Sequence, residues 1–254
     1  MKKADVIIQA RLGSTRLLGK VLLEVLGKPI LEYIVQRIKN AKSVSDIAIA
    51  TSMKGEDLRI VNLAESLGVK VFRGSEKDVL DRFYQAAKLY KMQHIIRICA
   101  DCPLMDPGII NKTVSLYFES HADYCSNILD RTFPDGLDVE VFTFGALEHA
   151  WNNADLLSER EHVTPYIRKR GDIFKLVNLK NEINLSSKRW TLDKSEDFEL
   201  IKSILESLYI KNPGFNMEDV LRFLGHNAHL EDLNRHIMQG EGYLKSLRED
   251  KQPI

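Results

Sequence analysis

Over the first 120 residues, short apolar runs alternate with longer stretches in which apolar residues recur every three or four positions. The short runs predict buried strands, at residues 6–8, 47–51, 69–72 and 94–99. The longer stretches predict helices with one face on a core, beginning near Pro29, Asp57, Asp78 and Pro107. Strands that alternate with helices in this way indicate an α/β domain with a mostly parallel sheet.

The alternation changes after about residue 120. Residues 122–126, 137–142, 174–179 and 189–192 are strand candidates without regular helices between them, which indicates a mixed sheet. Beyond Asp193 the pattern predicts a helix from Ser195 to Tyr209, then a second helix capped by Asn216 with Asp219 three positions later. We expect a main domain at residues 1–210 and a helical extension at 211–254, loosely attached from about residue 227.

Composition narrows the class of protein. The 254 residues carry 36 basic and 36 acidic side chains, and this balance argues against a general nucleic-acid binder. No apolar stretch is long enough for a signal peptide or a membrane span, which predicts a cytoplasmic protein. Cys99 and Cys102 could form a redox or metal pair, but two small buried residues are the favoured interpretation.

The loop after the first predicted strand, residues 9–20, is dense in cations and hydroxyl groups. Backbone amides and strand ends converge at that edge of an open α/β sheet, and glycines allow an anion to approach the backbone closely. This pattern predicts a triphosphate site formed by Ala10, Arg11, Gly13, Ser14, Thr15, Arg16 and Lys20. The spacing is neither a Walker A loop nor a dinucleotide fingerprint, and a solvated basic loop is the alternative.

Two carboxylates follow predicted strands and are candidate metal ligands. Asp101 comes just after residues 94–99, and Asp193 ends the run Arg-Trp-Thr-Leu-Asp. Magnesium commonly takes one or two protein carboxylates and completes its shell with water and phosphate oxygens. Either aspartate could instead cap a helix or a turn, and nothing in the linear sequence brings the two together.

Seven motifs that occur in order carry a family resemblance. They read IIQARLGSTRLLGK, ATS, VFRGS, ADCPLMDP, PDGLDVEVF, EREHVTPYI and RWTLD, and the resemblance that they carry covers about residues 4 to 205. Together they make the chain resemble the cytidylyltransferase family of spore coat polysaccharide biosynthesis protein F. That family is related to the synthetases that activate ketodeoxyoctonate and sialic acids as CMP-sugars. In the usual family loop a proline stands where this chain has Leu18.

The resemblance implies a Rossmann-like nucleotidyltransferase fold and a role for each motif. Arg11, Ser14, Arg16 and Lys20 would hold the triphosphate, and Asp101 and Asp193 would hold magnesium. Cytosine would lie near Thr51, Ser52, Arg73, Gly74 and Ser75. The acceptor would lie near Asp135, Gly136, Asp138, Glu140 and His162. A homodimer is implied as well.

Some roles stay open on the residues alone. His162 could be a general base or a structural hydrogen-bonding histidine. Asp138 and Glu140 alternate along a predicted strand, so they could orient an acceptor or form a solvated strand face.

The expected activity is transfer of CMP from CTP to a small anionic acceptor, with magnesium as cofactor and Arg11, Lys20, Asp101 and Asp193 as the catalytic residues. A sugar acid is the expected acceptor, with a polyol phosphate or a phosphonate as alternatives. A metal-dependent glycosyltransferase that uses a nucleotide-sugar is the competing enzyme. A non-catalytic nucleotide-binding relative is the competing binding protein.

Overall fold

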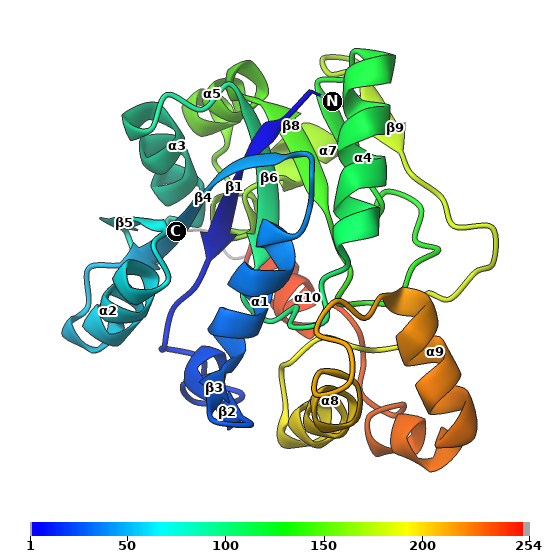
Figure 1. The fold of residues 1–254 in the computed structure, drawn as a ribbon. Coiled ribbons are helices and arrows are strands. Elements are labelled where there is room, and N and C mark those ends of the chain that lie inside the picture. The colour runs from blue at the N-terminus through cyan, green and yellow to red at the C-terminus, as the bar shows by residue number, and fades with distance from the viewer. Residues whose placement is uncertain (1, 251–254) are drawn as a thin grey trace.

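A computed structural model describes residues 2–250 and places one seven-stranded mixed sheet at the centre of the chain (Figure 1). The strand order is β5-β4-β1-β6-β8-β7-β9. β1, β4, β5 and β6 pair in parallel, β8 runs antiparallel to both of its neighbours, and β7 pairs in parallel with β9. The predicted mostly parallel mixed sheet is confirmed.

The sheet strands are β1 (Ala4–Gln9), β4 (Val44–Ser52), β5 (Lys70–Gly74), β6 (His94–Cys99), β7 (Tyr124–Ser126), β8 (Glu140–Thr143) and β9 (Leu176–Asn178). β2 (Glu24–Val25) and β3 (Lys28–Pro29) form a separate small hairpin. The helices are α1 (Ile30–Lys39), α2 (Leu58–Ser66), α3 (Val79–Leu89), α4 (Pro107–Ser120), α5 (Phe144–Asn153), α6 (Leu157–His162), α7 (Pro165–Arg168), α8 (Ser195–Leu208), α9 (Met217–His226) and α10 (Glu241–Glu249). Residues 2–250 also contain the short 3-10 helices η1 (Lys20–Leu22), η2 (Gly55–Asp57) and η3 (Ala228–Leu233).

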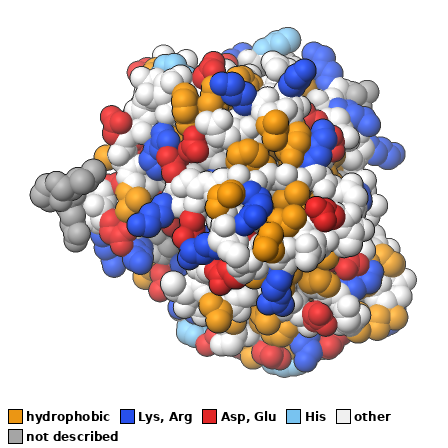
Figure 2. All heavy atoms as spheres, turned by 90° about the vertical axis from the view of Figure 1, so that its left-hand side faces the viewer, with side chains coloured by type: hydrophobic (Ala, Val, Ile, Leu, Met, Phe, Trp, Pro, Cys, Tyr) orange, Lys and Arg blue, Asp and Glu red, His pale blue; other side chains and the backbone are white. Residues whose placement is uncertain are grey.

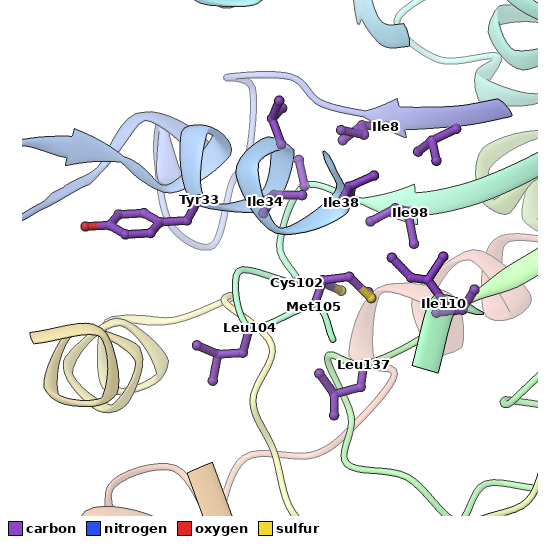
Figure 3. Close-up of a cluster of buried hydrophobic side chains, with 14 of the residues drawn as sticks. Ile8, Tyr33, Ile34, Ile38, Ile98, Cys102, Leu104, Met105, Ile110 and Leu137 are labelled. Atoms are coloured by element: carbon purple, nitrogen blue, oxygen red, sulfur yellow. The ribbon is translucent and has the colours of Figure 1, made fainter. Parts of the chain in front are cut away.

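Alternation along the strands builds two hydrophobic layers. In β1, Val6 and Ile8 belong to one buried cluster and Ile7 to the other, because successive strand residues face opposite sides of a sheet. Figure 3 shows the first cluster, in which Ile34 and Ile38 of α1 lie close to Ile8 and Ile98 of the sheet. Helices α3 and α5 cover the opposite face.

Several sequence predictions need correction. Residues 189–192 form no strand and make only an isolated bridge between Asp135 and Arg189. Helices α5, α6 and α7 were not predicted. The segment from residue 227 is not loosely attached: Asp250 accepts a hydrogen bond from the Ser158 amide at 2.8 Å, and Asn234, 2% exposed, donates to Asp197 at 2.8 Å. Its polar sequence hid these contacts because they are hydrogen bonds rather than a hydrophobic stripe.

The mixture of charges on the surface and the hydropathy of the helices agree with the balanced composition of the chain. On the face shown in Figure 2, acidic, basic and hydrophobic side chains are intermixed, so that face carries no continuous basic patch. Within residues 2–250, no helix combines the length and the hydropathy needed to cross a bilayer.

Candidate active site

The loop that follows β1 forms one side of a cavity of about 380 Å³. Arg11, Ser14, Arg16 and Lys20 line this cavity, together with Asp101, which follows β6. Ala10, Gly13 and Thr15 line it too. β1 and β6 are neighbours in the sheet, so the phosphate loop and Asp101 leave the same edge, where ligands bind in open α/β sheets. We call this space the loop cavity.

Lys20 joins the two predicted metal ligands. Its Nζ lies 2.9 Å from Asp101 Oδ2 and 2.7 Å from Asp193 Oδ1, and it donates to the Leu192 carbonyl at 2.8 Å. The structure therefore brings Asp101 and Asp193 together, although 92 positions separate them. The two carboxylates raise the pKa of Lys20 and outweigh its burial, so the side chain stays an ammonium. Its three N–H groups are all occupied, so Lys20 must leave at least one partner before it can contact a triphosphate.

Neither aspartate is a helix cap. Lys194 occupies the cap position of α8, and the helix begins without a side-chain cap from Asp193. Asp106 caps α4, which leaves Asp101 free to face the cavity. The interpretation of either residue as a helix cap is therefore wrong, although Asp101 does lie in a turn.

A buried ion pair holds the Asp193 backbone in place. The fully buried Asp197 accepts from the Asp193 amide at 2.9 Å and from both ends of the Arg189 guanidinium at 2.8 Å. The Asn234 amide adds a further bond to the same carboxylate. Because these partners fix the chain at Asp193, its side chain is presented towards Lys20 rather than left on a mobile loop.

The other cations of the loop also have protein partners. Arg16 donates to Asp193 Oδ1 at 2.8 Å, and Arg11 lies 3.8 Å from Glu161 on α6. Leu18, at the position usually taken by proline, is 81% exposed and makes no contribution to this network. Arg11 and Arg16 are therefore paired with carboxylates and also partly exposed to solvent, and binding of a triphosphate by this loop stays a prediction.

The residues expected near cytosine do not line the loop cavity. Thr51 and Ser52 are fully buried, and the Arg73 guanidinium donates to the Met53 and Lys54 carbonyls at 2.8 and 3.0 Å. A Cβ on Gly74 would lie 2.8 Å from Phe72, so this strand end is tightly packed. Ser75 accepts from the Asp78 amide at 3.0 Å. Contact of these residues with a base stays a prediction.

A second cavity, of about 700 Å³, opens beside the first and shares Arg16, Arg97, Asp101 and His162 with it. We call it the acceptor cavity because the predicted acceptor residues gather there. Asp135, Asp138, Glu140 and His162 line it. Gly136 does not: its φ is +106°, and a Cβ would lie 2.5 Å from the Trp190 backbone. Gly136 therefore shapes the turn beside the cavity, where no other residue would fit.

The carboxylates of the acceptor cavity have different environments. Glu140, 1% exposed, pairs with Arg97 and accepts from the Tyr124 hydroxyl at 2.6 Å. Asp138 is held by both ends of Arg131, at 2.9 and 2.7 Å. These two carboxylates therefore already hold arginines, and a solvated strand face is excluded for Glu140.

Asp135 and His162 have shifted pKa values. Burial, reinforced by Asp138, raises the pKa of Asp135 to about 7. Burial lowers the pKa of His162 to about 4, and its Nε2 lies 3.1 Å from Ser246 Oγ on α10. His162 is therefore neutral near pH 7, as a general base must be, but this nitrogen already has a partner.

Sequence reasoning missed three contributors to the loop cavity. Arg82 of α3 is 2% exposed and faces the cavity, and Arg97 lies between the two cavities. Helix α10 supplies Gly242, Lys245 and Ser246 to the wall opposite the phosphate loop. Arg82 lies in an amphipathic stretch and Arg97 in an apolar stretch. In each case the signal in the sequence is a single arginine among apolar residues.

The two cysteines do not behave as a reactive pair. Burial raises the pKa of Cys99 to about 12 and that of Cys102 well above its usual value. Both thiols stay protonated. The interpretation of two buried small residues holds for Cys102, whereas Cys99 is half-buried and lines both cavities.

The donor set fits a magnesium ion. Asp101 Oδ2 and Asp193 Oδ1 both lie within 2.9 Å of the same cationic atom, so the two oxygens can share one cation. Within residues 2–250, no group of three or more His, Cys, Asp and Glu side chains forms a complete cage. A two-carboxylate site is what magnesium uses when phosphate oxygens and water complete its shell.

Comparison with known proteins identifies the chain's relatives. A family model described as cytidylyltransferase matches residues 6–220. An uncharacterized protein of Methanocaldococcus jannaschii is 42% identical over 96% of this chain and 97% of its own. The spore coat polysaccharide biosynthesis protein SpsF of Bacillus subtilis is 30% identical over 87% of this chain and 93% of its own. The 3-deoxy-manno-octulosonate cytidylyltransferase of Chloroherpeton thalassium is 31% identical over 52% of this chain and 53% of its own.

A solved structure agrees with the fold. The cytidylyltransferase from Leptospira borgpetersenii superposes with a TM-score of 0.85 at 34% identity, covering 91% of this chain and 97% of its own. The predicted Rossmann-like nucleotidyltransferase fold is thereby confirmed.

Proposed function

This chain belongs to the cytidylyltransferase family, and we propose that it transfers CMP from CTP to the hydroxyl group of a sugar acid. The observation that carries the proposal is the convergence of Asp101 and Asp193 on Lys20, beside a loop that supplies Arg11 and Arg16. A triphosphate needs this density of cations, and a metal needs this pair of carboxylates.

We infer that the two substrates bind in the two separate cavities. The triphosphate lies along residues 11–20 in the loop cavity, and the acceptor lies in the acceptor cavity. The shared residues Arg16 and Asp101 lie where the two substrates meet. This arrangement supports direct attack of an acceptor oxygen on the α-phosphate, because it holds both reactants at one point.

The reaction balances without a covalent enzyme intermediate. A bond forms between the acceptor oxygen and the α-phosphorus, and the bond from that phosphorus to the oxygen bridging to the β-phosphate breaks. Pyrophosphate leaves with the bonding pair, and the hydroxyl proton passes to a base or to solvent. Arg11, Arg16 and Lys20 stabilise the charge that develops on the leaving group.

Asp101 and Asp193 are the proposed magnesium ligands. Magnesium, when bound, neutralises phosphate charge. The ammonium nitrogen of Lys20 lies between these two carboxylates, which supports the fit of a metal cation at the same position.

The relatives support the acceptor class and the setting. SpsF is a spore coat polysaccharide biosynthesis protein, and the relative from Chloroherpeton thalassium is a cytidylyltransferase of 3-deoxy-manno-octulosonate, a sugar acid. We extend this to surface polysaccharide biosynthesis for the present chain. A cytoplasmic location and a homodimer belong to the same proposal, the first supported by three free cysteines.

A thermal shift experiment tests the donor and the metal. Each of the four ribonucleoside triphosphates is added with and without magnesium, since a ligand of the native state raises Tm by mass action. We expect the largest rise with CTP and magnesium together. If no triphosphate raises Tm, the proposed function is wrong. If a nucleotide-sugar raises Tm instead, the result favours a glycosyltransferase.

A further inference from the structure

The acceptor cavity is lined by five arginines, and four of them are already paired. Their carboxylate partners are Asp193 for Arg16, Glu140 for Arg97, Asp138 for Arg131 and Asp197 for Arg189. The fifth is Arg168, at the end of α7. No carboxylate of residues 2–250 forms a salt bridge with it, and its guanidinium stands 4.8 Å from the centre of the Tyr243 ring.

Tyr243 reaches the cavity from the far end of the chain. It lies on α10, beyond the residues that the family model matches. Its ring packs against the His162 ring with centroids 5.1 Å apart, and Arg168 and Lys169 both lie over it. A ring face that attracts a guanidinium fixes its orientation without neutralising its charge. Arg168 therefore keeps its N–H donors available on the side away from the ring.

The position of α10 explains why Tyr243 is held there. Ser246 donates to Glu161 at 2.6 Å and contacts His162, while Lys194 lies 3.4 Å from Glu241. The helix is therefore joined to α6 on one side and to the start of α8 on the other. These contacts make α10 a wall of both cavities rather than a surface appendage.

We propose that Arg168 binds the carboxylate of the acceptor, and that Tyr243 of α10 positions the guanidinium for this contact. The inference rests on the proposed cytidylyltransferase function and names the part of the acceptor that is recognised. A guanidinium presents a planar pair of donors that matches the two oxygens of a carboxylate. The other four arginines lack this freedom because carboxylates of the chain already occupy them.

Steady-state kinetics of pyrophosphate release test the proposal on the full chain. The probe acceptors are 3-deoxy-manno-octulosonate, its methyl ester at the carboxyl group, and glycerol 3-phosphate. We expect the wild-type protein to use the acid and to discriminate against the ester. Arg168→Gln should raise KM for the acid about tenfold or more, because a charge-assisted bidentate contact is lost. KM for CTP should stay within about twofold.

The Tyr243 variants separate positioning from folding. Tyr243→Phe keeps the ring and should retain the wild-type KM for the acid. Tyr243→Ala should raise that KM and leave the rise in Tm caused by CTP with magnesium unchanged. Arg248→Gln is the matched control, since Arg248 is an exposed arginine of α10 that lines neither cavity.

Each of the remaining outcomes counts against a specific part of the proposal. If the wild type uses the acid and Arg168→Gln leaves both its KM and the preference over the ester intact, the carboxylate assignment is wrong while the proposed function stands. Use of glycerol 3-phosphate but not the acid would also overturn the carboxylate assignment. No pyrophosphate release with any probe, despite stabilisation by CTP, would count against both the sugar-acid acceptor and this site.

Discussion

At the scale of single residues, the site is held by ion pairs that already exist without substrate. Arg11, Arg16 and Lys20 face Glu161, Asp193 and Asp101 respectively. Lys20 is buried, and a buried ammonium is stable only with partners, whereas Arg11 and Arg16 are partly exposed to solvent. Lys20 stands at the centre of this arrangement, since it contacts both proposed metal ligands.

We predict that Lys20→Met makes the protein respond to magnesium alone. Removal of the ammonium leaves Asp101 and Asp193 close together with one fewer cation, which should lower stability by about 1–3 kcal/mol. Magnesium at millimolar concentration should then raise Tm in the variant and have little effect in the wild type. Differential scanning fluorimetry without nucleotide measures this, with Lys112→Met, an exposed lysine on α4, as control. Equal magnesium shifts in all three proteins would show that Lys20 does not occupy the place of the metal.

At the scale of elements, the site is built from the ends of parallel strands and closed by a short helix. β1 and β6 deliver the phosphate loop and Asp101 to one edge because they pair in register, Gln9 opposite Cys99. Helix α10 then lies across from the loop, with Gly242 close to the Arg16 guanidinium. A Cβ at residue 242 would be in tight contact with this guanidinium.

Gly242→Val tests the closeness of that contact. A Cβ at residue 242 would lie 3.1 Å from Arg16 Nη1, so the larger side chain should displace the guanidinium from Asp193. We expect KM for CTP to rise about three- to tenfold, in line with a lost interaction on the order of 1 kcal/mol, with little change in Tm. Gly225→Val on α9 is the control, because a Cβ there meets no atom within 4 Å. An unchanged KM in Gly242→Val would show that α10 does not constrain Arg16.

The sequence was most informative where regular patterns and capping residues agree. The strands β1, β4 and β6 and the helix after Asn216 were predicted because apolar periodicity and a capping box are local signals. The meeting of Asp101 and Asp193 was not predictable from spacing, since it depends on strand order and on Lys20 between them. The run at residues 189–192 forms no strand because its amides bond to two separate segments, Trp190 to the Asp135 carbonyl and Leu192 to the Asp101 carbonyl.

At the scale of the whole molecule, the residues beyond the predicted boundary at 210 share the main core. Phe215, Met217, Val220 and Leu224 belong to the same buried cluster as α1 and α4. The buried Arg37 of α1 donates to the Phe215 carbonyl at 2.7 Å, with its guanidinium 4.0 Å from the ring centre. The part of the chain outside the first 210 residues therefore supports the sheet that carries the site.

We predict that a chain truncated after residue 210 loses much of its stability. Four buried apolar side chains would be removed, each worth about 1.5–3 kcal/mol of burial, and Arg37 would lose a buried partner. Urea unfolding followed by circular dichroism should show a loss of more than about 5 kcal/mol. Truncation after Gln239 is the comparison: it removes α10, in which Ser246 is the buried residue, and should cost far less. Equal stability of the 1–210 fragment and the full chain would mean that the boundary marks an independent domain.

The loop cavity joins residues from opposite ends of the chain, with Arg16 on one wall and Gly242 on the other. During synthesis the strands β1, β4 and β6 leave the ribosome long before α10 is made, and domains begin to fold in that order. A nascent chain can therefore build most of its sheet while its nucleotide cavity is still open on one side. Closure of that cavity requires α10, so the wall formed by Gly242, Lys245 and Ser246 can be added only after residue 240 has been translated.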